Sequence, residues 1–233
     1  MKQNKFIILV TQRNAVNYIT KCLDSIITQD YDNYEAIIMD DASTDGTWGI
    51  VKKYPFHAIR NKIKETHFVK NFLKGIKLYA TDPQDIIVFL SGDDWLACDD
   101  ALSHLNKAYQ DDIWFTYGQF IPASGNYGPY CTPIPDTRTY RRSGQWVTSH
   151  LISFKKKLWS LIDDKDLRYK NGEYPNYAVD RAFMYPMIEM AGARHIKLIE
   201  KVLYVYNDLN DFCCYKLNPE DSIKYAEYYM NKP

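Results

Sequence analysis

The stretch from Asp85 to Leu96, which reads DIIVFLSGDDWL, decides the fold of this chain. Its unbroken apolar run, residues 86–90, is typical of a strand buried on both faces at the centre of a parallel sheet. The run ends at Ser91 and Gly92, and two adjacent carboxylates follow it. Carboxylates beyond the carboxyl end of such a strand lie at the ligand crevice and can hold a cation that binds phosphate. Aspartate is also a preferred N-cap residue of helices, so the stretch alone leaves both interpretations open.

Strands and helices alternate over about the first 95 residues. Apolar runs predict strands at 6–10, 34–39, 56–59 and 86–90, and helical spacing of apolar residues predicts helices at 16–27, 47–53 and 68–79. This alternation is the pattern of a mostly parallel, Rossmann-like sheet covered by helices, which places the chain in the α/β class. Three of the strands end in polar clusters, at 11–14, 40–45 and 91–94, and we expect these clusters to converge on one crevice.

The second half of the chain is more aromatic and less regular. Helices are predicted at 101–109, 155–162, 178–191 and 219–229, strands at 113–120, 146–154, 196–199 and 202–206, and a loop at 163–177. Pro186 is expected to kink the third of these helices or to break it in two. A proline-rich loop at 121–143 carries Arg138, Arg141 and Arg142, which either form a solvated face or belong to a lid that reaches phosphate or acceptor.

Composition limits the functions that the chain can have. The 233 residues include 29 basic and 29 acidic side chains, so the chain lacks the broad positive field that nucleic-acid binding needs. Five cysteines without metal-ligand spacing favour a reducing, cytoplasmic compartment. No apolar stretch reaches the length of a transmembrane segment. We predict one domain, residues 1–233, because we find no repeat and no convincing linker.

Four segments of the chain together resemble a known family: FIILVTQRNAVNYITKCLDSIITQDYDNYEAIIMDDASTDGTW near the start, IIVFLSGDDWL, WVTSHLISF, and VDRAFMYPMIEMAGARHIKLIEKVLYVYN. Their order and spacing are similar to those of family 2 of the nucleotide-sugar-dependent glycosyltransferases, which have the GT-A fold. The resemblance implies a nucleotide-binding half at 1–96 and a smaller acceptor-side half at 97–233.

The resemblance also implies which residues hold the donor. Thr11, Arg13 and Asp41 fall at the nucleotide base, although Arg13 replaces a tyrosine that is frequent there. The metal-binding DxD motif of the family falls on Ser91-Gly92-Asp93, so its first aspartate is a serine in this chain. Asp93 is then expected to coordinate Mn²⁺ or Mg²⁺ on the donor diphosphate, and Ser91 and Gly92 to contact the nucleotide.

On the acceptor side, the resemblance places the general base at Asp180. Its plainer interpretation is an exposed first-turn aspartate that the helix dipole stabilises. His150 falls where related chains line the sugar site, or it is a packed core histidine. The remaining candidate substrate-binding residues are Asp94, Trp95 and Glu189. Glu189 lies more than two helical turns from Asp180, so the two cannot act as a close pair.

We therefore expect a metal-dependent, inverting transferase. It would move a hexose-type sugar from a nucleoside diphosphate, with UDP favoured, to a hydroxyl of a glycan, glycoprotein or other acceptor. The protein could form a homodimer, which the sequence does not decide. One rival is a nucleotidyltransferase, but the stretch TQRNAVNY after the first strand lacks the glycine-rich phosphate loop of that class. The other rival is a non-catalytic nucleotide- or glycan-binding module, which the incomplete DxD motif favours.

Overall fold

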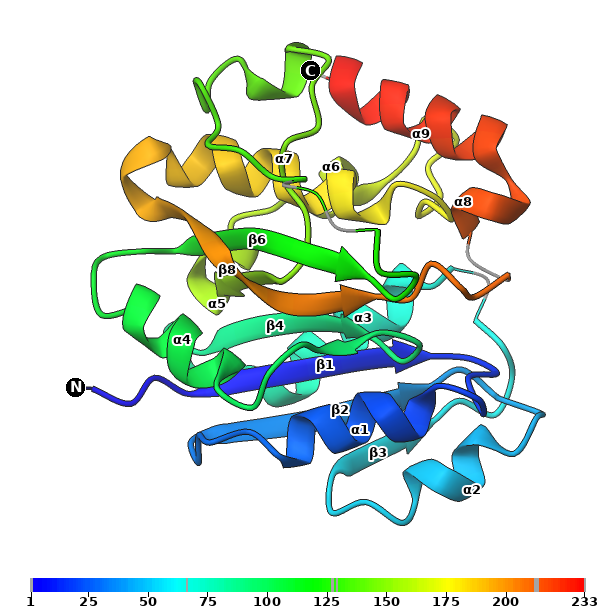
Figure 1. The fold of residues 1–233 in the computed structure, drawn as a ribbon. Helices are drawn as coiled ribbons and strands as arrows, with labels where there is room; N and C mark the ends of the chain where they lie inside the picture. Colours follow the sequence, from blue (N-terminus) through cyan, green and yellow to red (C-terminus); the bar gives the residue numbers. More distant parts are fainter. Residues whose placement is uncertain (1, 66, 127, 129, 212–213, 233) are drawn as a thin grey trace.

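A single curled sheet forms the centre of the molecule in the computed structural model, which describes residues 2–65, 67–126, 128, 130–211 and 214–232 (Figure 1). Its strands among these residues are β1 (Phe6–Gln12), β2 (Tyr34–Asp40), β3 (His57–Arg60), β4 (Ile86–Ser91), β5 (Trp95–Leu96), β6 (Phe115–Pro122), β7 (Ile152–Lys155) and β8 (Ile196–Tyr206). They lie in the order β3-β2-β1-β4-β7-β6-β8-β5.

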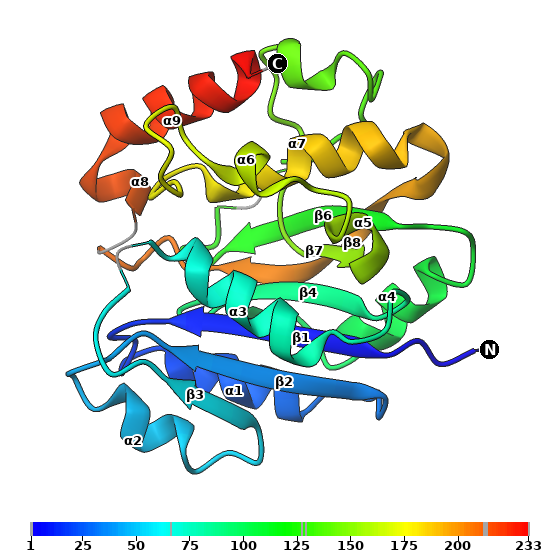
Figure 2. The same ribbon diagram turned by 180° about the vertical axis from the view of Figure 1, so that it is seen from behind.

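Two layers of helices cover this sheet (Figures 1 and 2). The helices are α1 (Ile19–Ile27), α2 (Thr47–Val51), α3 (Val69–Tyr79), α4 (Ala101–Ala108), α5 (Lys156–Trp159), α6 (Asp164–Leu167), α7 (Val179–Ala191), α8 (Cys214–Leu217) and α9 (Pro219–Asn231). Side chains of α1, α2 and α4 pack on one face of the sheet, and those of α3, α5 and α7 pack on the other. Strands β1, β2 and β4 contribute buried apolar residues to both faces, which is why their sequences are continuous apolar runs.

The predicted parallel sheet is confirmed for its first four strands. β1 pairs in parallel with β2 on one side and with β4 on the other, and β3 extends the sheet beyond β2. β7 joins the second half of the chain to this sheet, since it pairs antiparallel with both β4 and β6. β6 and β8 pair in parallel and β5 pairs antiparallel with β8, so four of the seven pairings among the described strands are parallel.

Several expectations for the second half were wrong in detail. Residues 146–151 are irregular, and β7 begins only at Ile152. The two strands expected at 196–199 and 202–206 are one strand, β8. Its register against β6 shifts between Ile199 and Val202, so Glu200 and Lys201 are accommodated as an irregularity without ending the strand. A short helix, α6, lies within the expected loop at 163–177. α7 continues through Pro186 without a break, since the neighbouring Tyr185 and Met187 are both buried and hold the helix against the core.

Within the described part of the chain, no helix has both the length and the apolar character that crossing a bilayer requires.

Candidate active site

The polar clusters that follow the first strands lie side by side. In the parallel register, Thr11 of β1 stands between Met39 of β2 and Ser91 of β4, and Gln12 stands opposite Asp40. The carboxyl ends of β1, β2 and β4 therefore meet at one edge of the sheet, as expected (Figure 1). Thr11 is buried, and its hydroxyl oxygen has no hydrogen-bond partner among the described residues.

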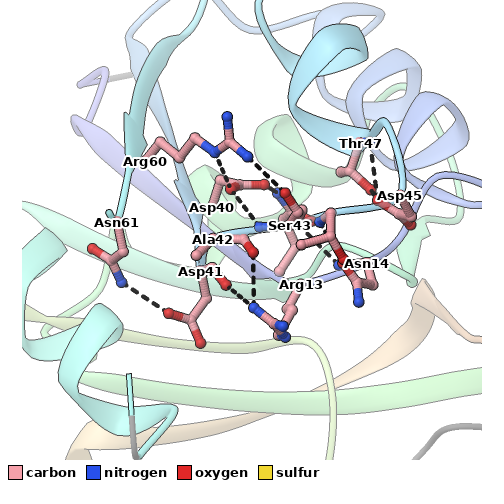
Figure 3. Close-up of polar contacts among 12 residues, drawn as sticks. Arg13, Asn14, Asp40, Asp41, Ala42, Ser43, Asp45, Thr47, Arg60 and Asn61 are labelled. Carbon is pink, nitrogen blue, oxygen red and sulfur yellow. Dashed lines mark hydrogen bonds and ion pairs between the residues drawn. The ribbon is translucent and has the colours of Figure 1, made fainter. Parts of the chain in front are cut away.

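Two arginines hold the loop that follows β2, as Figure 3 shows. Arg13 Nη1 donates to the carbonyl oxygens of Asp41 at 2.6 Å and Ala42 at 2.9 Å. Arg60 Nη2 donates to the carbonyl oxygen of Ser43 at 2.6 Å, and its Nε lies 3.4 Å from a carboxylate oxygen of the buried Asp40. Ala42 has a φ of 54°, in the left-handed region that non-glycine residues rarely adopt. The two guanidinium groups thus stabilise a strained loop.

The side chain of Asp41 is buried and held from one side. Its Oδ1 accepts hydrogen bonds from Asn61 Nδ2 at 2.9 Å and from the backbone N–H of Glu65 at 2.8 Å. Both bonds fall on the same oxygen, so Oδ2 keeps its acceptor capacity with respect to the described residues. An open hollow of ≈ 600 Å³ lies beside this loop, and its lining includes Arg13, Ala42, Asn61 and Lys62.

The turn after β4 requires glycine. The N–H of Gly92 donates to the carbonyl of Thr11 at 3.0 Å, so this turn lies directly against β1. A Cβ at position 92 would stand 2.4 Å from the Cβ of Gln12, a separation that real side chains do not reach. Only a residue without a side chain allows the turn to bring Asp93 this close to the end of β1.

The adjacent carboxylates Asp93 and Asp94 lie in different surroundings. Asp94 is buried and accepts hydrogen bonds from the Tyr204 hydroxyl at 2.5 Å and from the backbone N–H of Asn207 at 2.7 Å. Burial and the nearby Asp93 raise the pKa of Asp94 to about 7. Asp93 is half-buried, and its Oδ2 accepts from Asn210 Nδ2 at 2.7 Å. Asp94 therefore ties the turn to β8, and Asp93 remains the carboxylate nearer to solvent.

The oxygen ligands at this turn suit a hard cation that also binds a diphosphate. The described residues contain no group of three or more His, Cys, Asp or Glu side chains that could hold a metal ion by themselves. Asp93 offers a carboxylate and Ser91 a hydroxyl, both oxygen ligands. Mg²⁺ and similar ions are commonly held by one or two carboxylates together with substrate phosphates and water. The residues present therefore suit Mn²⁺ or Mg²⁺ that a diphosphate helps to bind.

His150 belongs to the same wall of the site as Asp94. Its ring stacks on that of Tyr204, with centroids 4.5 Å apart and planes at 14°. Burial lowers the pKa of His150 to about 4, so the ring is neutral at pH 7. Its Nδ1 is enclosed and has no partner in the described part of the chain. An enclosed ring nitrogen without a partner is costly, and a ligand that supplies a hydrogen bond would remove this cost.

Asp180 lies in the first turn of α7, which begins on the side where the central strands end and runs back across the sheet (Figure 1). Its Oδ1 accepts from the backbone N–H of Arg181 at 2.9 Å. Burial raises the pKa of Asp180 above 3.8, and the positive charge of Arg181 partly opposes this effect. A carboxylate with a raised pKa is a better proton acceptor than an exposed aspartate.

Other candidates lie away from this edge or are held by neighbours. Glu189 is near the far end of α7, where it forms an ion pair with Arg141 at 2.6 Å. Trp95 lies in β5 with the ammonium group of Lys21 3.6 Å from its ring centroid. In the loop at 121–143, Arg141 is held by Glu189, and Arg138 pairs with its neighbour Asp136. These contacts do not test the predicted roles of Glu189 and Trp95 in substrate binding.

Sequence reasoning missed several polar residues that complete the site. Arg60 is the last residue of β3 and Asn61 follows it; the third predicted strand ended at residue 59, and no polar cluster was predicted after it. Tyr204 and Asn207, which hold Asp94, are 110 and 113 residues away from it in the chain. Only the first pair had a sequence signal, namely their place directly after an apolar run.

Comparison with known proteins decides the family. The family model for glycosyl transferase family 2 matches residues 7–161. The chain belongs to glycosyl transferase family 2. It is 31% identical over 186 residues to glycosyltransferase GlyA of Streptococcus pneumoniae, a match that covers 77% of this chain and 24% of GlyA.

The fold of the chain is similar to solved structures of glycosyltransferases with the GT-A fold. Staphylococcus aureus TarS 1-349 in complex with UDP-GlcNAc has a TM-score of 0.67 at 19% identity, covering 88% of this chain and 58% of that one. Mannosyltransferase PcManGT of Pyrobaculum calidifontis, in complex with GDP-Man and Mn²⁺, has a TM-score of 0.64 at 17% identity, covering 99% and 70%. The chain spans only about a quarter of GlyA, so this likeness does not assign it a substrate.

Proposed function

We propose that this family 2 glycosyltransferase moves a hexose-type sugar from UDP to a hydroxyl acceptor in a single inverting displacement. The observation that carries the proposal is the convergence of Thr11, Asp41 and Asp93 at the carboxyl edge of the sheet. Asp180 begins a helix on the same side of the molecule. The acceptor is a glycan, a glycoprotein or another hydroxyl compound.

The preference for uracil is supported by the hydrogen bonds of Asp41. Two donors from the chain already occupy Oδ1, which leaves Oδ2 for the base. Uracil presents one imide N–H, which one oxygen can accept. Guanine presents a ring N–H and an amino group side by side, which pair best with the two oxygens of one carboxylate, and Oδ1 already accepts two hydrogen bonds. Asp41 in this arrangement therefore suits uracil better than guanine.

In the reaction that we propose, Asp180 accepts the proton of the acceptor hydroxyl while the oxygen attacks the anomeric carbon. The bond from that carbon to the diphosphate oxygen breaks, and its electron pair leaves with UDP. A divalent cation, when bound, would neutralise the charge of the departing diphosphate, and Asp93 with Ser91 would hold it. His150, neutral and packed on Tyr204, would line the sugar pocket.

Binding of free nucleotides tests this proposal directly. By calorimetry with Mn²⁺, UDP should bind about tenfold or more tightly than GDP, because guanine would leave one donor without a partner. Sugar release from a panel of UDP-sugars should then be catalytic. Equal affinity for UDP and GDP would contradict the assignment of Asp41. UDP binding without turnover of any UDP-sugar would favour the non-catalytic module instead.

The metal site has its own test. In the wild type, Mn²⁺ should raise the affinity for UDP by about tenfold or more, and this gain should disappear in Asp93→Ala. UDP affinity in the presence of a chelator should be the same for both proteins. Asp111→Ala, an exposed aspartate far from the edge, serves as the control and should keep the full effect of Mn²⁺. An undiminished effect in Asp93→Ala would remove this residue from the metal site.

Three further properties are part of the proposal. Both halves of the chain contribute strands to one sheet and side chains to one aromatic cluster (Phe72, Phe89, Phe154 and Phe183). This supports a single domain over residues 1–233. Cys22, Cys98 and Cys131 are free thiols, which supports a cytoplasmic compartment. The homodimer remains a hypothesis that size measurement in solution can test.

A further inference from the structure

The chain that leaves β3 touches both the base-binding residue and the segment that leads to Asp180. Asn61 and Glu65 donate to Asp41 Oδ1, as described above. Two residues after Glu65, His67 forms a hydrogen bond to the other half of the molecule: its Nδ1 lies 3.0 Å from Oδ1 of Asn176. One short stretch of chain therefore contacts the nucleotide side and the acceptor side within seven positions.

His67 is placed to hold this contact. It is only 8% exposed, while its partner Asn176 is on the surface. Its second ring nitrogen, Nε2, lies 3.9 Å from a carboxylate oxygen of Glu173. Both nitrogens of the ring thus face the segment at 173–176. The 3.9 Å separation of Nε2 from Glu173 is longer than a hydrogen bond, so the bond to Asn176 is the contact that holds the buried ring.

The segment that His67 holds runs directly into α7. Ala178, with a φ of 51°, is the last residue before the helix, and Asp180 is its second residue. A non-glycine residue in the left-handed region persists where its surroundings hold it. The helix behind it is anchored on α3, since the rings of Phe183 and Phe72 stack with centroids 5.7 Å apart. The start of α7 is therefore the part whose position depends on the preceding segment.

We propose that His67 is a positioning residue that ties Asp180 to the nucleotide site, so that UDP bound at Asp41 stabilises the start of α7. The proposal rests on the proposed function. A base that binds Asp41 restricts its carboxylate and, through Asn61 and Glu65, the stretch that contains His67. If bound UDP stabilises the His67–Asn176 contact, then by linkage the formed contact raises the affinity for UDP by the same factor. Asp180 would then be fully ordered only when the donor is present.

Hydrogen exchange measures this ordering in the intact protein. Adding UDP and Mn²⁺ to the wild type should slow amide exchange in residues 169–179 by about fivefold or more, together with exchange in residues 61–65. In His67→Leu the slowing at 169–179 should be lost, and UDP should bind up to about fivefold more weakly than to the wild type, the loss that linkage requires when the contact is missing. Turnover should fall about tenfold, and the KM for the donor should rise by no more than about fivefold, because Asp180 is displaced and the direct nucleotide contacts are intact.

Three further variants separate positioning from general stability. His67→Asn can present an amide N–H to Asn176 and should restore the slowing and most of the turnover. Asn176→Ala removes the same hydrogen bond from the exposed side, where folding is not threatened, and should reproduce the His67→Leu result. His57→Leu changes an exposed histidine on the edge strand β3 and should match the wild type.

The outcomes distinguish this inference from the function on which it rests. If UDP does not bind the wild type, the proposed function fails. If UDP binds and slows exchange at 61–65 but not at 169–179, the function stands and the role of His67 is wrong. The role of His67 is equally wrong if Asn176→Ala and His67→Leu keep the slowing at 169–179.

Discussion

Asp180→Asn should lower the turnover number by about 10²- to 10⁴-fold, the range expected for the loss of a general base. The amide has nearly the same shape as the carboxylate but cannot accept the proton of the acceptor hydroxyl. The helix should stay intact, because an amide oxygen can still accept the 2.9 Å hydrogen bond from the backbone N–H of Arg181. UDP affinity should not change, so the whole loss should lie in turnover.

The matched control is Asp221→Asn, an aspartate in the first turn of α9. If first-turn aspartates mattered here only through the helix dipole, both substitutions would have small and similar effects. A turnover number for Asp180→Asn close to that of the wild type would remove Asp180 from the mechanism.

The pH dependence of the wild type provides a second measurement on the same residue. Asp180 acts as a base only when ionised, so kcat/KM should fall as pH falls through its pKa. Because burial raises the pKa of Asp180, this decline should be centred above 3.8, the value of an ordinary aspartate. A decline centred at or below 3.8 would show that the carboxylate is not enclosed as described.

Gly92→Ala should lower the stability of the protein more than any other small substitution at the carboxyl ends of the central strands. Its Cβ would lie 2.4 Å from the Cβ of Gln12, so either the turn or the end of β1 must move. Overpacking of this kind costs about 1–3 kcal/mol, which for a chain of this size lowers the melting temperature by about 2–4 °C per kcal/mol. The displaced turn carries Asp93, so the gain in UDP affinity from Mn²⁺ should also be reduced.

Gly49→Ala provides the comparison, because a Cβ at this position in α2 would meet nothing within 4 Å. Alanine is a better helix former than glycine, so the melting temperature should stay the same or rise. A Gly92→Ala protein as stable as the wild type would contradict the close approach of the turn to β1.

Much of the nucleotide-binding half could be predicted from its residues. The runs at 6–10, 34–39 and 86–90 are apolar at every or nearly every position, which only a strand covered on both faces tolerates. The second half was harder to predict, because its elements depend on their partners. Residues 146–151 have the composition of a strand but are irregular, and Glu200 with Lys201 interrupt the apolar pattern of a strand that is continuous.

The sequence by itself determined the central sheet and the strand ends at which the candidate site lies, because these follow from local apolar runs and the polar residues that end them. The family followed from the resemblance of its motifs to glycosyl transferase family 2. The tertiary structure alone decided how the polar residues divide their roles. Asp93 and Asp94 are neighbours in the chain, yet Tyr204 and Asn207 from β8 and its end bury one of them and leave the other nearer to solvent. Arg13 holds the loop of Asp41, and His67 meets Asn176 from 109 residues away. Such contacts join segments that are distant in sequence, and only their packing in three dimensions sets which atoms meet.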